Sequence, residues 1–144
     1  MTKISFYILP TDTLDSKDLF AIKFCKQFWR KGKNLYCVVE NREVAEKIDS
    51  LLWETSDSFI PHAIEDEKQK LTSKPIEVGI GWNIPKHRHG ILINLTNNIP
   101  KWFAHFDNLV EIVVQQSDVL AASRKNWNFL TDLGYEIKSF DLRK

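Results

Sequence analysis

Short apolar runs alternate with segments of helical periodicity in the first third of the chain. Residues 3–9 are rich in strand-forming side chains and are followed by Pro10, which predicts a first strand. A helix then follows, for which Ser16 is a suitable cap and Gly32 a suitable C-terminal stop. The apolar residues that give this helix its period are Leu19, Ile22, Cys25 and Phe28, and Phe20, Phe24 and Trp29 widen the same face.

The same alternation continues to the end of the chain. Residues 35–39 predict a second strand, and Asn41 caps a second helix that ends near Trp53. A polar stretch rich in Lys and Glu, residues 65–74, is typical of a surface loop. The remaining predicted elements are strands at 76–80 and 90–95, a short helix at 102–106, a strand at 109–114, a helix from the cap Ser117 to about Gly134, and a last strand or sheet edge at 135–142.

This order of elements predicts an α/β fold. Strands that alternate with helices favour a mainly parallel sheet with helices on both faces and right-handed crossovers. A chain of 144 residues fits one compact domain, and no repeat or internal linker divides it. We therefore expect a single domain over residues 1–144.

Charge and apolar runs limit the classes of partner. The chain has 20 Lys and Arg against 19 Asp and Glu, a formal net charge of +1, so no global positive field drives binding to nucleic acid. Direct binding of nucleic acid through a local cluster of Lys and Arg remains an alternative, although such a cluster is usually a solvated helix face. No apolar run suits a signal peptide or reaches the ~20 residues of a membrane span, so we expect a cytoplasmic protein. The cluster consists of Lys23, Lys26, Arg30, Lys31 and Lys33.

The glycine patterns that bind phosphate groups are missing. Gly79 and Gly81 are not followed by a third glycine, so a turn or bulge explains them better than a dinucleotide site. Gly32 and Lys33 resemble the end of a phosphate loop, but Asn34 replaces the Ser or Thr that binds magnesium. We therefore predict no nucleotide cofactor.

Metal and thiol chemistry is also weakly represented. His87 and His89 are spaced like two ligands on one strand face, but no third ligand accompanies them, so we predict no metal site. Cys25 and Cys37 form no C-x-x-C motif and are expected to be buried free thiols. An enzyme that uses converging carboxylates or His87, His89 and His105 remains the alternative to a binding protein.

The last long helix carries two stripes of side chains. On the second stripe, Leu120, Arg124 and Trp127 follow i, i+4, i+7 spacing and should meet at the surface. A guanidinium beside an indole and a leucine suits a peptide that offers both a carboxylate and an apolar side chain. The alternative is that Trp127 widens the core contact while Arg124 is solvated. The first stripe, expected to pack on the sheet, contains Val119, Ala122, Asn126, Leu130 and Leu133, with Asn126 its weak member.

A second candidate surface follows the second helix. Large apolar side chains in an otherwise polar segment can mark a partner surface, or the loop can fold back onto the core. The residues concerned are Trp53, Phe59, Ile60 and Pro61.

Several of these segments together resemble the chi subunit family of bacterial DNA polymerase III. They are FYIL at residues 6–9, FWRKGK at 28–33, LW at 52–53, SFIPH at 58–62, GILINL at 90–95 and LGY at 133–135, and the resemblance extends in order along nearly the whole chain. It implies a single Rossmann-like three-layer domain without enzymatic activity or cofactor. The implied function is that of an adaptor between the clamp-loader assembly and single-stranded-DNA-binding protein.

The resemblance also assigns the two candidate surfaces. In the family, a pocket near the last long helix receives the acidic C-terminal tail of single-stranded-DNA-binding protein, which ends in proline and phenylalanine. Arg124 matches the expected arginine, Trp127 stands where the family often has tyrosine, and Asn128 replaces a lysine. Val113 is the candidate for an expected apolar pocket residue, beside Leu120.

The segment after the second helix resembles the family surface that receives the small psi subunit or a competing helicase. The residues that the resemblance assigns to this surface are Trp53, Phe59, Ile60, Pro61 and His62.

Overall fold

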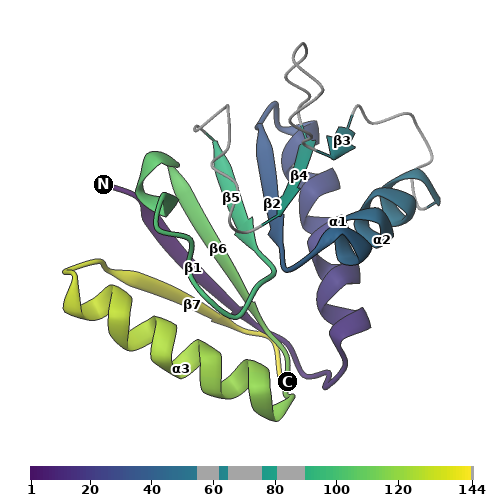
Figure 1. Cartoon of the computed structure of the whole chain (residues 1–144). Helices are drawn as coiled ribbons and strands as arrows, with labels where there is room; N and C mark the ends of the chain where they lie inside the picture. Colours follow the sequence, from purple (N-terminus) through teal and green to yellow (C-terminus); the bar gives the residue numbers. More distant parts are fainter. Residues whose placement is uncertain (55–61, 65–75, 81–89, 144) are drawn as a thin grey trace.

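The computed structural model describes residues 1–54, 62–64, 76–80 and 90–143, and the strands in these residues form one sheet (Figure 1). Every strand pairing in it is parallel, which confirms the predicted mainly parallel sheet, and the strand order is β3-β4-β2-β5-β6-β1-β7. The short strand β3 was not predicted, because its three residues lie between segments of loop composition. The strands are β1 (Lys3–Ile8), β2 (Leu35–Val39), β3 (His62–Ile64), β4 (Ile76–Ile80), β5 (Ile91–Asn94), β6 (Asn108–Val113) and β7 (Ile137–Asp141).

Helices cover both faces of the sheet, which confirms the three-layer α/β prediction. The alternation along β1 separates the faces: Phe6 contacts Trp127 of α3 with ring centroids 5.1 Å apart, whereas Tyr7 lies 5.5 Å from Phe24 of α1. Figure 1 shows α2 on the same side as α1. No helix in the described part of the chain is long and apolar enough to cross a membrane. The helices are α1 (Leu14–Arg30), α2 (Arg42–Glu54), the 3₁₀ turn η1 (Phe103–His105) and α3 (Ser117–Asp132).

The centre of the sheet is apolar. All five residues of β2 are buried, as expected for a parallel strand covered on both faces, and its bounds are those predicted. Cys37 of this strand and Cys25 of α1 are buried free thiols whose Sγ atoms lie 3.6 Å apart, which confirms that prediction. The hydrogen bond to Cys37 and burial together raise the pKa of the Cys25 thiol, so this group is inert at neutral pH.

Two of the predicted helix caps are wrong by a few residues. α1 begins at Leu14 because Thr13 is its N-cap: Thr13 Oγ1 accepts a hydrogen bond from the Ser16 backbone N–H at 3.2 Å. α3 begins at Ser117, but the capping side chain is that of Gln116, whose Oε1 accepts from the Val119 N–H at 3.0 Å. The capping residue thus lies three positions before the predicted one in α1 and one position before it in α3.

The other predicted helix ends are confirmed. Asn41 Oδ1 accepts a hydrogen bond from the Val44 N–H at 3.0 Å at the start of α2. Gly32 and Gly134 follow α1 and α3 with φ of 80° and 92°. Positive φ favours glycine at these C-terminal stops.

The buried face of α1 is rotated relative to the prediction. Leu19, expected in the core, has 44% of its surface exposed. Two charged residues are buried instead, because Lys17 Nζ donates to the Leu95 carbonyl at 3.1 Å and Asp18 pairs with Lys47 at 3.0 Å. The helix therefore contacts the sheet partly through polar groups that have partners.

Gly79 has a different role from the predicted turn or bulge. It lies inside β4 in continuous register with β2, opposite Val38. A Cβ atom on Gly79 would overlap the hydroxyl group of Tyr36. Glycine at this position therefore makes room for a neighbouring aromatic ring.

Candidate functional site

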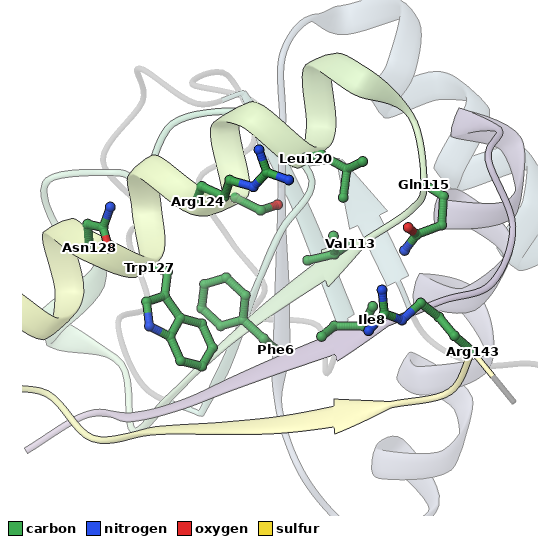
Figure 2. Close-up of a pocket in the computed structure, with 10 residues that line it drawn as sticks. Phe6, Ile8, Val113, Gln115, Leu120, Arg124, Trp127, Asn128 and Arg143 are labelled. Atoms are coloured by element: carbon green, nitrogen blue, oxygen red, sulfur yellow. The ribbon is translucent and has the colours of Figure 1, made fainter.

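A surface pocket lies between α3 and the carboxyl ends of β1 and β6 (Figure 2). Its volume is about 390 Å³, within the range of cavities that bind small ligands. It contains all five residues to which the family resemblance assigned tail binding, and five others that were not predicted. The lining residues are Phe6, Ile8, Val113, Gln115, Leu120, Ser123, Arg124, Trp127, Asn128 and Arg143.

Local geometry explains why these residues meet. Phe6 and Ile8 alternate onto the α3 side of β1, and Ile8 is the register partner of Val113 at the end of β6. On α3, Leu120 and Arg124 are separated by four residues and therefore lie on one helix face. The pocket is thus formed by one strip of a sheet and one strip of a helix.

The floor of the pocket is apolar. Phe6 and Val113 are 2% and 5% exposed and belong to the main core, while Leu120 and Trp127 are half-buried against it. The Trp127 and Phe6 rings pack edge to face at an interplanar angle of 72°. Trp127 therefore extends the core and lines the pocket at once, so the two interpretations that the sequence left open are compatible.

The rim of the pocket is polar and positively charged. Arg124 and Asn128 are exposed on α3, one helical turn apart. Arg143 reaches the pocket from the segment after β7 and pairs with Asp141, whose carboxylate accepts from Nε at 2.9 Å and from Nη2 at 2.7 Å. Gln115 is held by a 3.1 Å hydrogen bond from its Nε2 to the Leu9 carbonyl. This arrangement suits an apolar group that carries nearby carboxylates.

A polar contact joins α3 to the segment after β5, beside the apolar contacts of the helix with the core. Asn126, the weak member of the predicted core stripe, is 7% exposed, and its Nδ2 donates to the Asn97 carbonyl at 3.1 Å. Val119 and Leu130 of that stripe are buried as predicted. Leu133, by contrast, is 52% exposed, because α3 ends there. The amide of Asn126 thus ties the pocket helix to the segment that follows β5.

A second polar cluster lies beneath α3. Glu111 of β6 is 5% exposed, and its Oε1 accepts a hydrogen bond from Asn94 Nδ2 at 3.1 Å. Burial raises the pKa of Glu111 to about 8, against the opposing effects of Asn94 and Lys17. Burial also lowers the pKa of Lys17, against the attraction of neighbouring carboxylates. The cavity at this cluster measures only about 10 Å³, the space of roughly one water molecule, so a substrate does not fit.

A neighbouring cavity opens where β2 and β5 end and the helices begin, the usual ligand position in open α/β sheets. Its volume is about 170 Å³, below the usual range for ligand pockets. His105 lies on η1, before β6, and therefore at the opposite, amino end of the parallel strands. His87 and His89 lie outside the described residues. Among the residues that the structure describes, no group of three or more His, Cys, Asp or Glu side chains could hold a metal ion.

The second predicted surface lies largely outside the described residues. Phe59, Ile60 and Pro61 are not among them, and the side chains of Trp53, at the end of α2, and His62, in β3, are not described either. This assignment stays a prediction.

Comparison with known proteins gives a consistent result along the whole chain. The family model of the DNA polymerase III chi subunit, HolC, matches residues 1–138. The DNA polymerase III subunit chi of Pseudomonas aeruginosa is 27% identical over 143 residues, 99% of this chain and 98% of that protein. Its counterpart in Haemophilus influenzae is 26% identical over 137 residues, 93% of each chain.

One solved structure shows how general the fold is. A variant of the S. cerevisiae protein Dbp5, bound to RNA and ADP BeF3, is similar with a TM-score of 0.65 and 9% sequence identity. The similarity covers 97% of this chain and 41% of that one. At this level of identity the likeness shows the α/β fold alone.

Proposed function

Because the chain belongs to the DNA polymerase III chi subunit family, we propose that it is a non-catalytic adaptor of the replication machinery. In this proposal the α3 pocket binds the acidic C-terminal tail of single-stranded-DNA-binding protein. A second surface joins the chain to the clamp-loader assembly through psi, an equivalent partner or a helicase.

One observation carries the tail-binding proposal: an apolar floor and an exposed guanidinium belong to the same pocket. A terminal phenylalanine fits the floor formed by Phe6, Val113 and Trp127, where aromatic and aliphatic groups are already packed together. Arg124 lies on the rim beside that floor and can bind a carboxylate with two parallel N–H donors. An acidic peptide that ends in phenylalanine matches both features.

The charge of the chain supports a local rather than a global attraction. The net charge is only +1, so the positive groups of this rim, and not the whole molecule, must attract an acidic tail. A single exposed contact of this kind is weak and is weakened further by salt. Several tails tethered at one fork would raise the effective concentration and make such contacts useful.

Calorimetric titration with the last ten or so residues of the host single-stranded-DNA-binding protein tests the proposal. Arg124→Ala should lower the affinity about tenfold, the effect of losing about 1.5 kcal/mol from a hydrogen bond to a charged group. Lys125→Ala is the matched control, because Lys125 is an exposed cation on the same helix that does not line the pocket. Equal losses in the two variants would show a non-specific charge effect.

The peptide itself supplies a second test. Removing its terminal phenylalanine should weaken binding at least tenfold, because burying such a ring contributes about 1.5–3 kcal/mol. An unchanged affinity would exclude the apolar floor as the binding site.

The second surface rests on family membership and on the apolar residues that follow α2. Trp53→Ala and Phe59→Ala should each reduce co-purification with the clamp-loader subunits of the host while tail binding is retained. Ser50→Ala, an exposed change on α2, serves as the control. Full co-purification of both aromatic variants would place the clamp-loader contact elsewhere.

A further inference from the structure

The pocket has two guanidinium groups that come from two different elements of the fold. Arg124 belongs to α3, whereas Arg143 follows β7 near the C terminus. Figure 2 shows Arg124 over the middle of the pocket, near Leu120, and Arg143 beside Ile8, at the end away from Trp127 and Asn128. The two cations are therefore placed to bind two different anionic groups of one ligand.

Arg143 is held in its position by the fold. The Leu142 N–H donates to the Ile8 carbonyl at 2.8 Å, which ties the segment after β7 to the end of β1. The Arg143 backbone N–H donates to Asp141 Oδ1 at 3.0 Å, and the guanidinium makes two more hydrogen bonds to the same carboxylate. These contacts direct the side chain toward the pocket and restrict its motion, which lowers the entropic cost of binding a ligand.

The pair with Asp141 leaves binding capacity on Arg143. The guanidinium has five N–H donors, and Asp141 accepts from Nε and Nη2. The two side chains are 51% and 44% exposed, so a ligand can reach them from the solvent. Asp141 nevertheless competes with an incoming carboxylate for the same positive charge.

We propose that Arg143 is a second carboxylate-binding residue of the α3 pocket, so that the tail peptide is recognised by two anionic groups. This inference rests on the proposed function. Arg124 lies beside the apolar floor and takes the terminal carboxylate, which is attached directly to the inserted phenylalanine. Arg143 lies farther along the pocket, beside Ile8 and Gln115, and takes an acidic side chain upstream in the peptide.

Arg143 supplies a positive charge to a pocket in which Asn128 has none. The family resemblance expects a lysine at that position, which would put both positive charges of the pocket on α3. Here the exposed amide of Asn128 carries no charge, and the second cation enters from the C-terminal segment instead. The pocket thus has two cations, one on α3 and one on the segment after β7.

The test compares three synthetic tail peptides by calorimetry: the acidic peptide, the same peptide with its side-chain carboxylates changed to amides, and the acidic peptide with an amidated C terminus. Arg143→Gln should weaken binding of the acidic peptide about three- to fivefold, the upper part of the range expected for an exposed ion pair. The peptide without acidic side chains should bind Arg143→Gln and the wild type with equal affinity. The peptide with an amidated C terminus should still bind Arg143→Gln more weakly than it binds the wild type.

Two further variants sharpen the assignment. Asp141→Asn should increase affinity for the acidic peptide, because it removes the competing carboxylate while the backbone anchor at Leu142 remains. Lys138→Gln is the matched control: Lys138 is an exposed cation of β7 whose register partner Ser5 faces the α1 side, so this change should leave affinity within about twofold.

Each outcome has one meaning. If Arg143→Gln binds the acidic peptide as the wild type does, or loses equally for all three peptides, Arg143 does not bind a side-chain carboxylate and the inference is wrong, while the proposed function stands. If the wild type binds none of the peptides, the proposed function fails and the inference with it.

Discussion

Glu111→Gln should remove a large pH dependence from the stability of this domain. The Glu111 carboxyl group lies in β6 beneath α3, is 5% exposed, and accepts a hydrogen bond from Asn94. Burial raises its pKa from 4.5 to about 8 because the charged form is poorly solvated there. Gln keeps the size and the acceptor oxygen of the side chain and cannot ionise.

The sign of the effect follows from proton binding. Between pH 4.5 and about 8 the folded protein holds a proton on Glu111 that the unfolded chain has released. The free energy of unfolding therefore falls as pH rises, by about 1.4 kcal/mol per pH unit. The stabilisation is complete below pH 4.5 and is lost as pH rises to about 8, which amounts to about 5 kcal/mol over the whole interval.

Urea unfolding of the two proteins at several values between pH 5 and pH 8 measures this difference. The wild type should lose stability relative to Glu111→Gln as pH rises, and the variant should be clearly more stable at pH 8. Glu136→Gln, a change at an exposed carboxyl, controls for the general effect of removing one charge. Parallel stability curves for wild type and Glu111→Gln would refute the reasoning, since they would mean that Glu111 ionises equally in both states.

Two further pairs of variants test the fold by the same unfolding measurement. Gly90→Ala should cost more than Gly134→Ala: both positions have positive φ, which costs roughly 1–2 kcal/mol for other residues, but only at Gly90 does the added Cβ collide with backbone, at the Asn34 carbonyl. Equal losses would contradict that collision. Leu130→Ala should cost about 2–5 kcal/mol because Leu130 is fully buried, whereas Leu133→Ala should cost less than about 1 kcal/mol. A larger loss for Leu133→Ala than for Leu130→Ala would show that Leu133, and not Leu130, packs in the core.

Continuous apolar runs made much of the sheet predictable. The strand at 35–39 was predicted with the bounds that the structure has, because a parallel strand covered on both faces is an uninterrupted apolar run. The strand at 76–80, in which Glu77 and Gly79 alternate with three apolar residues, was also predicted with its observed bounds. Glycine after a helical segment predicted the ends of α1 and α3 equally well. These signals are local, so they need no knowledge of the sheet order.

Burial at helix surfaces was less predictable. Leu19 and Leu133 were both expected in the core, yet 44% and 52% of their surfaces are exposed. Leu19 is displaced by Lys17 and Asp18, whose partners come from other elements of the fold, and Leu133 lies where α3 ends. Periodicity indicates that a helix has an apolar side, but long-range contacts decide which residues at its margins are covered.

The helix side of the pocket could be predicted from local spacing, whereas its strand side could not. Leu120, Arg124 and Trp127 follow helical spacing, so their proximity was visible in the sequence. Phe6 and Ile8 also share one face of a strand by simple alternation. That this face lies under α3 depends on β1 pairing with β6, about a hundred residues away, which no local pattern specifies.

The placement of β7 brings a second charged side chain to the α3 pocket. Because β7 pairs in parallel with β1 at the edge of the sheet, the chain after it ends at the same carboxyl edge as β1 and β6. Arg143 thereby reaches a pocket whose other cation, Arg124, comes from α3. In a chain with almost no net charge, this crossover places two guanidinium groups around one apolar floor, and the proposed attraction of an acidic tail to one site rather than to the whole surface depends on that placement.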